Sequence, residues 1–150
     1  MGSWTQEGGI RQRAINGPET HRLGRVRAVL PSWLSWLGRQ VQEVLETDDD
    51  CLLMTLRRPW GLARTWEIFD AEERRVGILF RNLLLDGEGR HVAHARHNKD
   101  HRSGSFCDPD GSELGTFAVQ ESATLLAFSP TLEDNPFTRM ILLGAVLSWG

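Results

Sequence analysis

The sequence lacks a basic excess, a cysteine framework and an apolar run long enough to cross a bilayer. The net charge is −3 with 25% charged residues, which argues against a general nucleic-acid binder, because such proteins usually carry a strong basic excess. The two cysteines, Cys51 and Cys107, form no CxxC pair, so we expect ordinary buried thiols in a reducing compartment. Residues 1–28 contain no apolar core of a secretory signal, and the expected location is therefore cytoplasmic.

The longest apolar run predicts a buried helix at about residues 136–149. Asn135 is a favourable N-cap, and Pro136 occupies the position where a first helical residue loses no hydrogen bond. After Met140 only Ser148 is polar, so this helix has no side that suits water and must be surrounded by protein. The run is well short of the roughly 20 apolar residues that a membrane span requires.

Two N-terminal features suggest contact with a membrane. Residues 1–29 are rich in arginine and predict a flexible basic arm with little fixed structure. The following stretch places two tryptophans beside arginine, a combination typical of an interfacial element that meets anionic headgroups. The alternative is that its tryptophan face packs on the domain. The candidate membrane-contact residues are Arg25, Arg27, Trp33, Trp36 and Arg39.

Short paired strands are expected from residue 41 onward. Residues 41–46 and 51–58 flank four turn-prone residues and predict a hairpin. A helix over residues 33–45 is a competing interpretation, because several apolar residues there recur at helical spacing. The sequence leaves this choice between helix and strand open.

An internal repeat predicts hairpin corners. Asp70 and Asp108 are each followed seven residues later by a glycine, and Asp86 begins a degenerate copy that ends in alanine. The carboxylate can accept hydrogen bonds from turn amides, and the later glycine relieves crowding where a strand bends over a core. Catalytic use of these acids is not needed to explain them. We expect about eight to ten strands in a closed or nearly closed antiparallel barrel, since closure removes exposed edges and supplies a cavity for the apolar helix.

Several motifs follow one another in a fixed order: Arg58-Pro59-Trp60, Thr65-Trp66-Glu67-Ile68-Phe69-Asp70, Arg75-Val76-Gly77, the stretch from Phe106 to Gly115, and the Asn135-Pro136 start of the last helix. In this order the chain resembles the phospholipid scramblase and LURP-one-related family over about residues 30–150. The resemblance implies the fold of the tubby C-terminal domain, a mainly β (α+β) architecture in which an antiparallel β-barrel encloses a hydrophobic helix. It divides the chain into an arm, residues 1–29, and a barrel domain, residues 30–150.

The chain departs from animal scramblases in three features. It has no evident Pro-rich N-terminal region, no cysteine cluster for acylation and no clear acidic calcium-binding segment before the last helix. Glu133 and Asp134 occupy that place, and two acids are too few for a cage of six to eight oxygen ligands. They are weak calcium candidates, and we expect no other cofactor.

Four histidines, His91, His94, His97 and His101, crowd into a short stretch and resemble ligands for a transition metal. On a regular strand His91 and His97 share a face while His94 points the other way. A ready-made site is therefore not expected, and a solvated loop accounts for the polar residues that follow. His91 and His97 are retained as weak metal candidates.

Three functional hypotheses follow from the sequence. The first is a membrane-associated barrel that binds or translocates phospholipid, peripheral at the inner membrane face. The second is a soluble LURP-one-like module that binds an unspecified protein or small ligand without catalysis. The third and weakest is a metal-binding protein that uses the histidines, because no P-loop, HExxH motif, nucleophile elbow or dinucleotide fingerprint indicates an enzyme.

Overall fold

A computed structural model describes residues 4–7, 10–16, 22–28, 40–46, 51–59, 65–120 and 124–149, with side chains in 26–28, 40–45, 51–59, 65–120 and 124–149. These residues form a 12-stranded antiparallel sheet in which each strand pairs with its neighbours in sequence. The strands are β1 (Trp4–Glu7), β2 (Ile10–Asn16), β3 (Arg22–Ala28), β4 (Gln40–Glu46), β5 (Leu52–Arg58), β6 (Thr65–Asp70), β7 (Arg75–Phe80), β8 (Leu83–Asp86), β9 (His91–His97), β10 (Ser103–Cys107), β11 (Glu113–Val119) and β12 (Thr124–Phe128).

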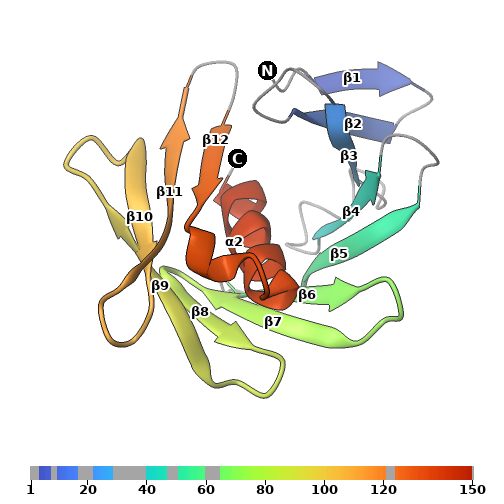
Figure 1. Ribbon diagram of the computed structural model, residues 1–150. Coiled ribbons are helices and arrows are strands. Elements are labelled where there is room, and N and C mark those ends of the chain that lie inside the picture. Colours follow the sequence, from blue (N-terminus) through green and yellow to red (C-terminus); the bar gives the residue numbers. More distant parts are fainter. Residues whose placement is uncertain are drawn as a thin grey trace.

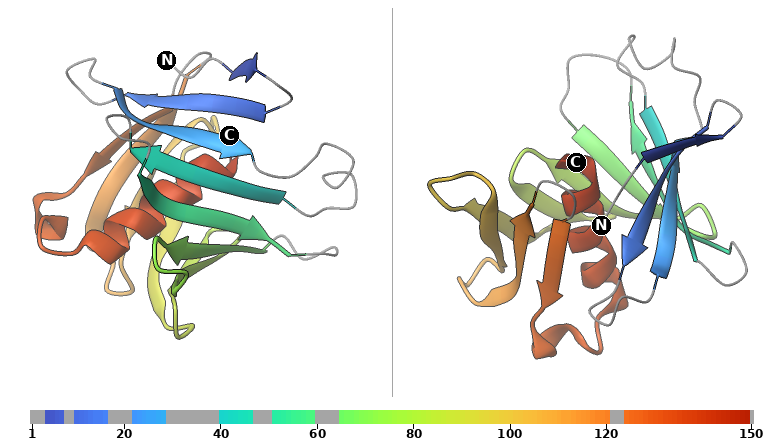
Figure 2. Two further views of the ribbon diagram at one scale, coloured as in Figure 1. Left: turned by 90° about the vertical axis from the view of Figure 1, so that its right-hand side faces the viewer. Right: turned by 90° about the horizontal axis from the view of Figure 1, so that it is seen from above.

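The α-helix α2 (Pro136–Trp149) follows the sheet after a short 3-10 turn, η1 (Pro130–Leu132). The Asn135 side chain caps the helix, because its Oδ1 accepts a hydrogen bond from the Thr138 amide at 3.1 Å. The sheet curves around α2, which lies along the concave side (Figures 1 and 2). The apolar C-terminal helix that the sequence predicts is therefore confirmed, with the expected bounds and cap.

The core lies between α2 and the sheet. Leu142 is 0% exposed, and Ile141 and Ala145 beside it are also buried. The helix approaches two strands so closely that a side chain larger than glycine would displace its neighbours at the contacts. A Cβ atom at Gly77 would lie 2.7 Å from Ile141 Cγ1, and one at Gly144 would lie 2.6 Å from Ile68 Cδ1. The helix thus fills the side of the sheet toward which it packs.

The N-terminal segment is not an unstructured arm. Strands β1, β2 and β3 lie within residues 1–29 and extend the same antiparallel sheet, so the expectation of little fixed structure is wrong for them. The reason is visible at Val26, which pairs with Val44 of β4, and both side chains are almost completely buried. Few apolar residues stand among the arginines of β3, which gives a weak sequence signal. The burial of Val26 against β4 nevertheless stabilises this strand.

The competing helix over residues 33–45 is wrong for residues 40–45, which belong to β4. A β-bulge interrupts the pairing of β4 with β5 between Val44 and Leu45. Val44 and Leu45 are both buried, and this succession hides the alternation expected of a strand. Residues 33–39 lie outside the described part of the chain.

The mainly antiparallel β architecture with one C-terminal helix is confirmed, and the strand number exceeds the expected eight to ten because of β1–β3. Among the described strands, β1 and β12 form the edges of the sheet and are not paired with each other. Closure into a barrel therefore stays a prediction.

The Asp repeats form hairpin corners, as the sequence predicts. Asp70 Oδ1 accepts hydrogen bonds from the amides of Glu72 and Arg74 at 3.0 and 2.9 Å, while its Oδ2 pairs with Arg74 Nε at 2.8 Å. Asp86 repeats this arrangement with Glu88 and Arg90. In the third copy the Asp108 carboxylate accepts from the Ser112 amide at 2.8 Å. Each of these carboxylates therefore accepts hydrogen bonds from its own turn.

These contacts lower two carboxyl pKa values. Burial raises the pKa of Asp70, but the Arg74 amide, the Arg74 guanidinium and the Glu72 amide together hold it below the ordinary value of 3.8. The Arg90 amide and guanidinium, with the Glu88 amide, likewise outweigh burial and lower the pKa of Asp86.

We expect acid to destabilise the protein through these two corners. As the pH falls toward and below 3.8, the unfolded chain binds protons before folded Asp70 and Asp86 do. The contribution of these two carboxylates to the free energy of unfolding should therefore be fully present above about pH 5 and decline as the pH falls further. The double variant Asp70→Asn with Asp86→Asn keeps an acceptor oxygen for the turn amides but cannot titrate. Urea denaturation from pH 3 to 7 should show that the free energy of unfolding falls less steeply with acid in the variant than in the wild type. An equally steep fall in both proteins would contradict this origin.

Candidate functional site: the basic end of the sheet

The residues predicted to contact a membrane are only partly described. Arg27 lies on β3, and its guanidinium forms an ion pair with Glu43 on β4, with Nε 3.1 Å from Oε2. Its charge is therefore already met within the sheet. Arg25 lies on the same strand, and its side chain is outside the description. Trp33, Trp36 and Arg39 lie outside the described residues, so their membrane role stays a prediction.

The histidines are arranged differently from the regular alternation expected for a strand. The pairing of β8 with β9 shifts between Leu84 and Leu85, and Leu85 opposes His91 while Val92 is skipped. This bulge brings His91 beside His94, with ring centroids 5.7 Å apart. The expectation that His91 shares a face with His97 is therefore wrong.

His97 lies on the inner side of the sheet. Its ring centroid is 5.1 Å from that of Trp149 on α2 and 5.2 Å from that of Phe117 on β11. His94 instead opposes Cys107 of β10 and Leu83 of β8, and it is half-buried. Within the described part of the chain, no group of three or more His, Cys, Asp or Glu side chains is placed to hold a metal ion.

The weak calcium candidates Glu133 and Asp134 are exposed in the connection between η1 and α2. No third potential ligand gathers with them among the residues that the structure describes. Cys107 is buried as expected, whereas Cys51 is exposed, so the expectation of a buried thiol is wrong there.

The two ends of the sheet carry different charged residues. Successive hairpins of an antiparallel meander fall at alternate ends. The hairpins β6–β7, β8–β9 and β10–β11 and the start of α2 therefore share one end, which carries the Asp corners and is called the acidic end. The β7–β8 turn and the β9–β10 hairpin share the other end, which we call the basic end. The β7–β8 and β9–β10 hairpins contribute the cationic side chains Arg81, Arg96, Lys99 and Arg102 to this end.

The β7–β8 turn holds the first of these cations. Arg81 adopts a left-handed backbone conformation with φ of 55°, and its guanidinium carbon lies 5.4 Å from the centre of the Phe80 ring. The neighbouring Asn82 carbonyl accepts a hydrogen bond from the Ala95 amide at 2.8 Å. This bond ties the turn to β9, next to Arg96, and fixes both cations on one rim of the sheet.

The β9–β10 hairpin adds further positive charge. Its turn is closed by the Asn98 amide donating to the Ser103 carbonyl at 2.8 Å. Asp100 is the acid of this hairpin, and its Oδ1 accepts from the Arg102 amide at 3.0 Å. The amides of Arg102 and Ser103 outweigh burial and lower the Asp100 pKa.

The four cations of the basic end lack acidic partners among the described residues, in contrast to the acidic end, where arginines and carboxylates pair. The end is also rigidly packed from within. Trp149, at the C-terminus of α2, stacks on Phe106 with centroids 5.8 Å apart. The negative end of the helix dipole therefore lies at the cationic end of the sheet, which stabilises this polarity.

Sequence reasoning treated the 96–104 stretch as a solvated loop and did not identify the basic end. The sequence does contain a signal for this end, because alternate hairpins carry cationic residues. It could be found only after the meander order was known, because the cations come from two separate turns. Chemically, unpaired guanidinium and ammonium groups on a rim bind phosphate and other anions.

Comparison with protein-family models, with curated proteins and with solved structures found no match. Among the described residues, no helix has the length and apolar character needed to cross a membrane.

Proposed function

We propose that this protein is a non-enzymatic lipid-surface binder that attaches to anionic phospholipid headgroups through the basic end. The observation that carries the proposal is the set of cations Arg81, Arg96, Lys99 and Arg102 on one rim of the sheet, which have no ion pair among the described residues, whereas Arg74 and Arg90 at the opposite end pair with carboxylates. Each cation near an anionic surface contributes about 1 kcal/mol to attachment. Anionic lipids are concentrated in cytoplasmic leaflets, so the proposed location is peripheral at the inner membrane face.

The packing of α2 favours binding over translocation. A helix whose central side chains are buried against the sheet leaves the concave side filled with protein, and a lipid route along it would require the core to open. The proposal includes closure of the sheet into a tubby-like barrel of the scramblase and LURP-one-related type. Because the strand ends that flank residues 29–39 lie at the basic end by the meander order, the Trp33, Trp36 and Arg39 segment belongs to the same proposal.

Charge neutralisation at the basic end tests the proposal. Arg96→Gln with Arg102→Gln should weaken flotation with anionic phosphatidylserine vesicles about tenfold or more, since two headgroup contacts are lost. Arg90→Gln with Arg139→Gln removes the same charge from the acidic end and serves as the matched control. It should bind nearly as wild type does. Equal loss of binding in both variants would mean that only net charge matters and would overturn the assigned site. The same flotation with and without calcium would test Glu133 and Asp134.

A further inference from the structure

An apolar patch covers the outer face of the sheet next to the basic end. The register pairs Ile78 with Leu85 and Phe80 with Leu83, and residues directly opposite in an antiparallel pair share a face. The intervening pair, Leu79 with Leu84, is buried toward α2. Ile78, Phe80, Leu83 and Leu85 therefore point outward, and we call them the outer patch.

The outer patch is not part of the core. Phe80 is 44% exposed, and Ile78, Leu83 and Leu85 are half-buried beside it. The patch continues onto β9, where His94 opposes Leu83 and His91 opposes Leu85. A cluster of apolar side chains on a solvent-facing sheet surface is typical of an interaction site.

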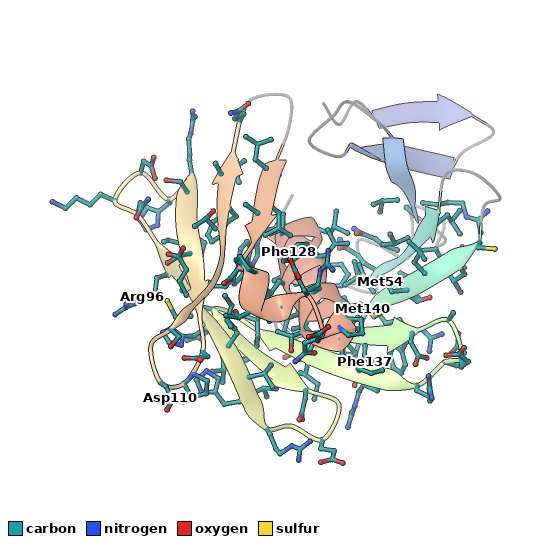
Figure 3. All side chains as sticks on the ribbon, in the orientation of Figure 1. Met54, Arg96, Asp110, Phe128, Phe137 and Met140 are labelled. Carbon is teal, nitrogen blue, oxygen red and sulfur yellow. The ribbon has the colours of Figure 1, made fainter. Side chains whose placement is uncertain are left out.

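Positive charge flanks the outer patch. Arg81 lies over the Phe80 ring, and Arg96, two residues beyond His94, points away from α2 on the outer side of the sheet (Figure 3). The carboxylate in the same row, Glu67, is paired with Arg75 at 3.2 Å. The patch thus presents apolar side chains with free arginines at its rim and its nearest acid neutralised.

We propose that the outer patch is the face that rests on the bilayer, with Phe80 inserted below the headgroups and Arg81 and Arg96 contacting phosphate. This inference rests on the proposed function and adds the orientation of the protein and an apolar contribution to binding. Charge complementarity favours an anionic lipid surface as the occupant, because an aromatic tip flanked by arginines matches the layered polarity of a membrane interface. An acidic protein surface is the alternative that the experiment separates.

Phe80→Ser should lower the affinity for phosphatidylserine vesicles about tenfold, because the variant lacks the aromatic ring that enters the bilayer. The arginines beside the patch remain. Leu125→Ser is the matched control: Leu125 is 54% exposed on β12, outside the patch, and its loss should change binding less than twofold. Thermal melting would verify that both variants fold. Unchanged binding of Phe80→Ser, beside wild-type protein that does bind, would overturn the patch and leave the proposed function standing.

A position-specific probe supplies the second measurement. In a Cys51→Ser background, Phe80→Cys or Leu125→Cys would carry an environment-sensitive fluorophore, since the remaining Cys107 is buried. The emission of the fluorophore at position 80 should shift to shorter wavelength with anionic vesicles, and the emission at position 125 should not. Binding without a shift at 80 would contradict insertion. Failure of the wild-type chain to float would overturn both the patch and the proposed function, and binding to a soluble acidic polypeptide in its place would identify a protein occupant.

Discussion

Leu142→Asp is expected to abolish cooperative folding. Leu142 is 0% exposed in the centre of α2, so the substitution buries a carboxylate in the apolar core. The cost combines the lost apolar contacts with the penalty for an unpaired charge or for its protonation, and we expect at least about 4 kcal/mol. This is a large part of the free energy of unfolding of an ordinary domain.

Phe137→Asp provides the control for the helix. Phe137 is 51% exposed in the first turn of α2, where an acidic side chain also suits the helix dipole. This variant should melt cooperatively near the wild-type temperature. Circular dichroism melts of both proteins make the comparison, and a cooperatively melting Leu142→Asp protein would show that α2 is not the centre of the fold.

Gly104→Ala is expected to destabilise the protein by at least about 2 kcal/mol although it adds one methyl group. A Cβ at this position would lie 2.1 Å from the Arg96 carbonyl oxygen and 2.7 Å from Phe117 Cζ. The first of these atoms belongs to the paired strand, so the backbone of β9 or β10 must move. The shift would reach the β9–β10 hairpin and hence the basic end.

Ser105→Ala is the matched control for Gly104, because it changes the next residue of β10 without adding an atom to the inner side. Its hydroxyl makes only a long contact of 3.8 Å with Cys107 Sγ, and we expect a small change in stability. Urea denaturation would measure both variants. A Gly104→Ala protein as stable as wild type would show that β9 and β10 are not packed as closely as described.

The sequence predicts those parts of the fold whose signal is local. Asn135 and Pro136 mark the start of α2, and the uniform apolar character after Met140 predicts its burial, because capping and hydrophobicity act within a few residues. The Asp corners were likewise predictable, since Asp70 and Asp86 bond to amides within four residues.

Features that depend on pairing could not be predicted in this way. Strand β3 is held by Val26 against Val44 of another strand, and the bulges next to Val44 and Val92 break the alternation on which face assignments rest. The candidate site has the same difficulty. Arg81 lies in the β7–β8 turn and Arg96 near the end of β9, and only the order of the strands places both at the same end of the sheet.

The central claim is that the protein binds anionic membranes through its outer surface while its filled interior conducts no lipid. The most direct test adds the full chain to vesicles containing phosphatidylserine and a fluorescent lipid, then measures both co-flotation and the fraction of that lipid bleached by an impermeant reductant. The account predicts flotation with anionic but not neutral vesicles, with the bleached fraction remaining at the outer-leaflet value. Complete bleaching in the presence of the protein, or no flotation with anionic vesicles, would contradict it.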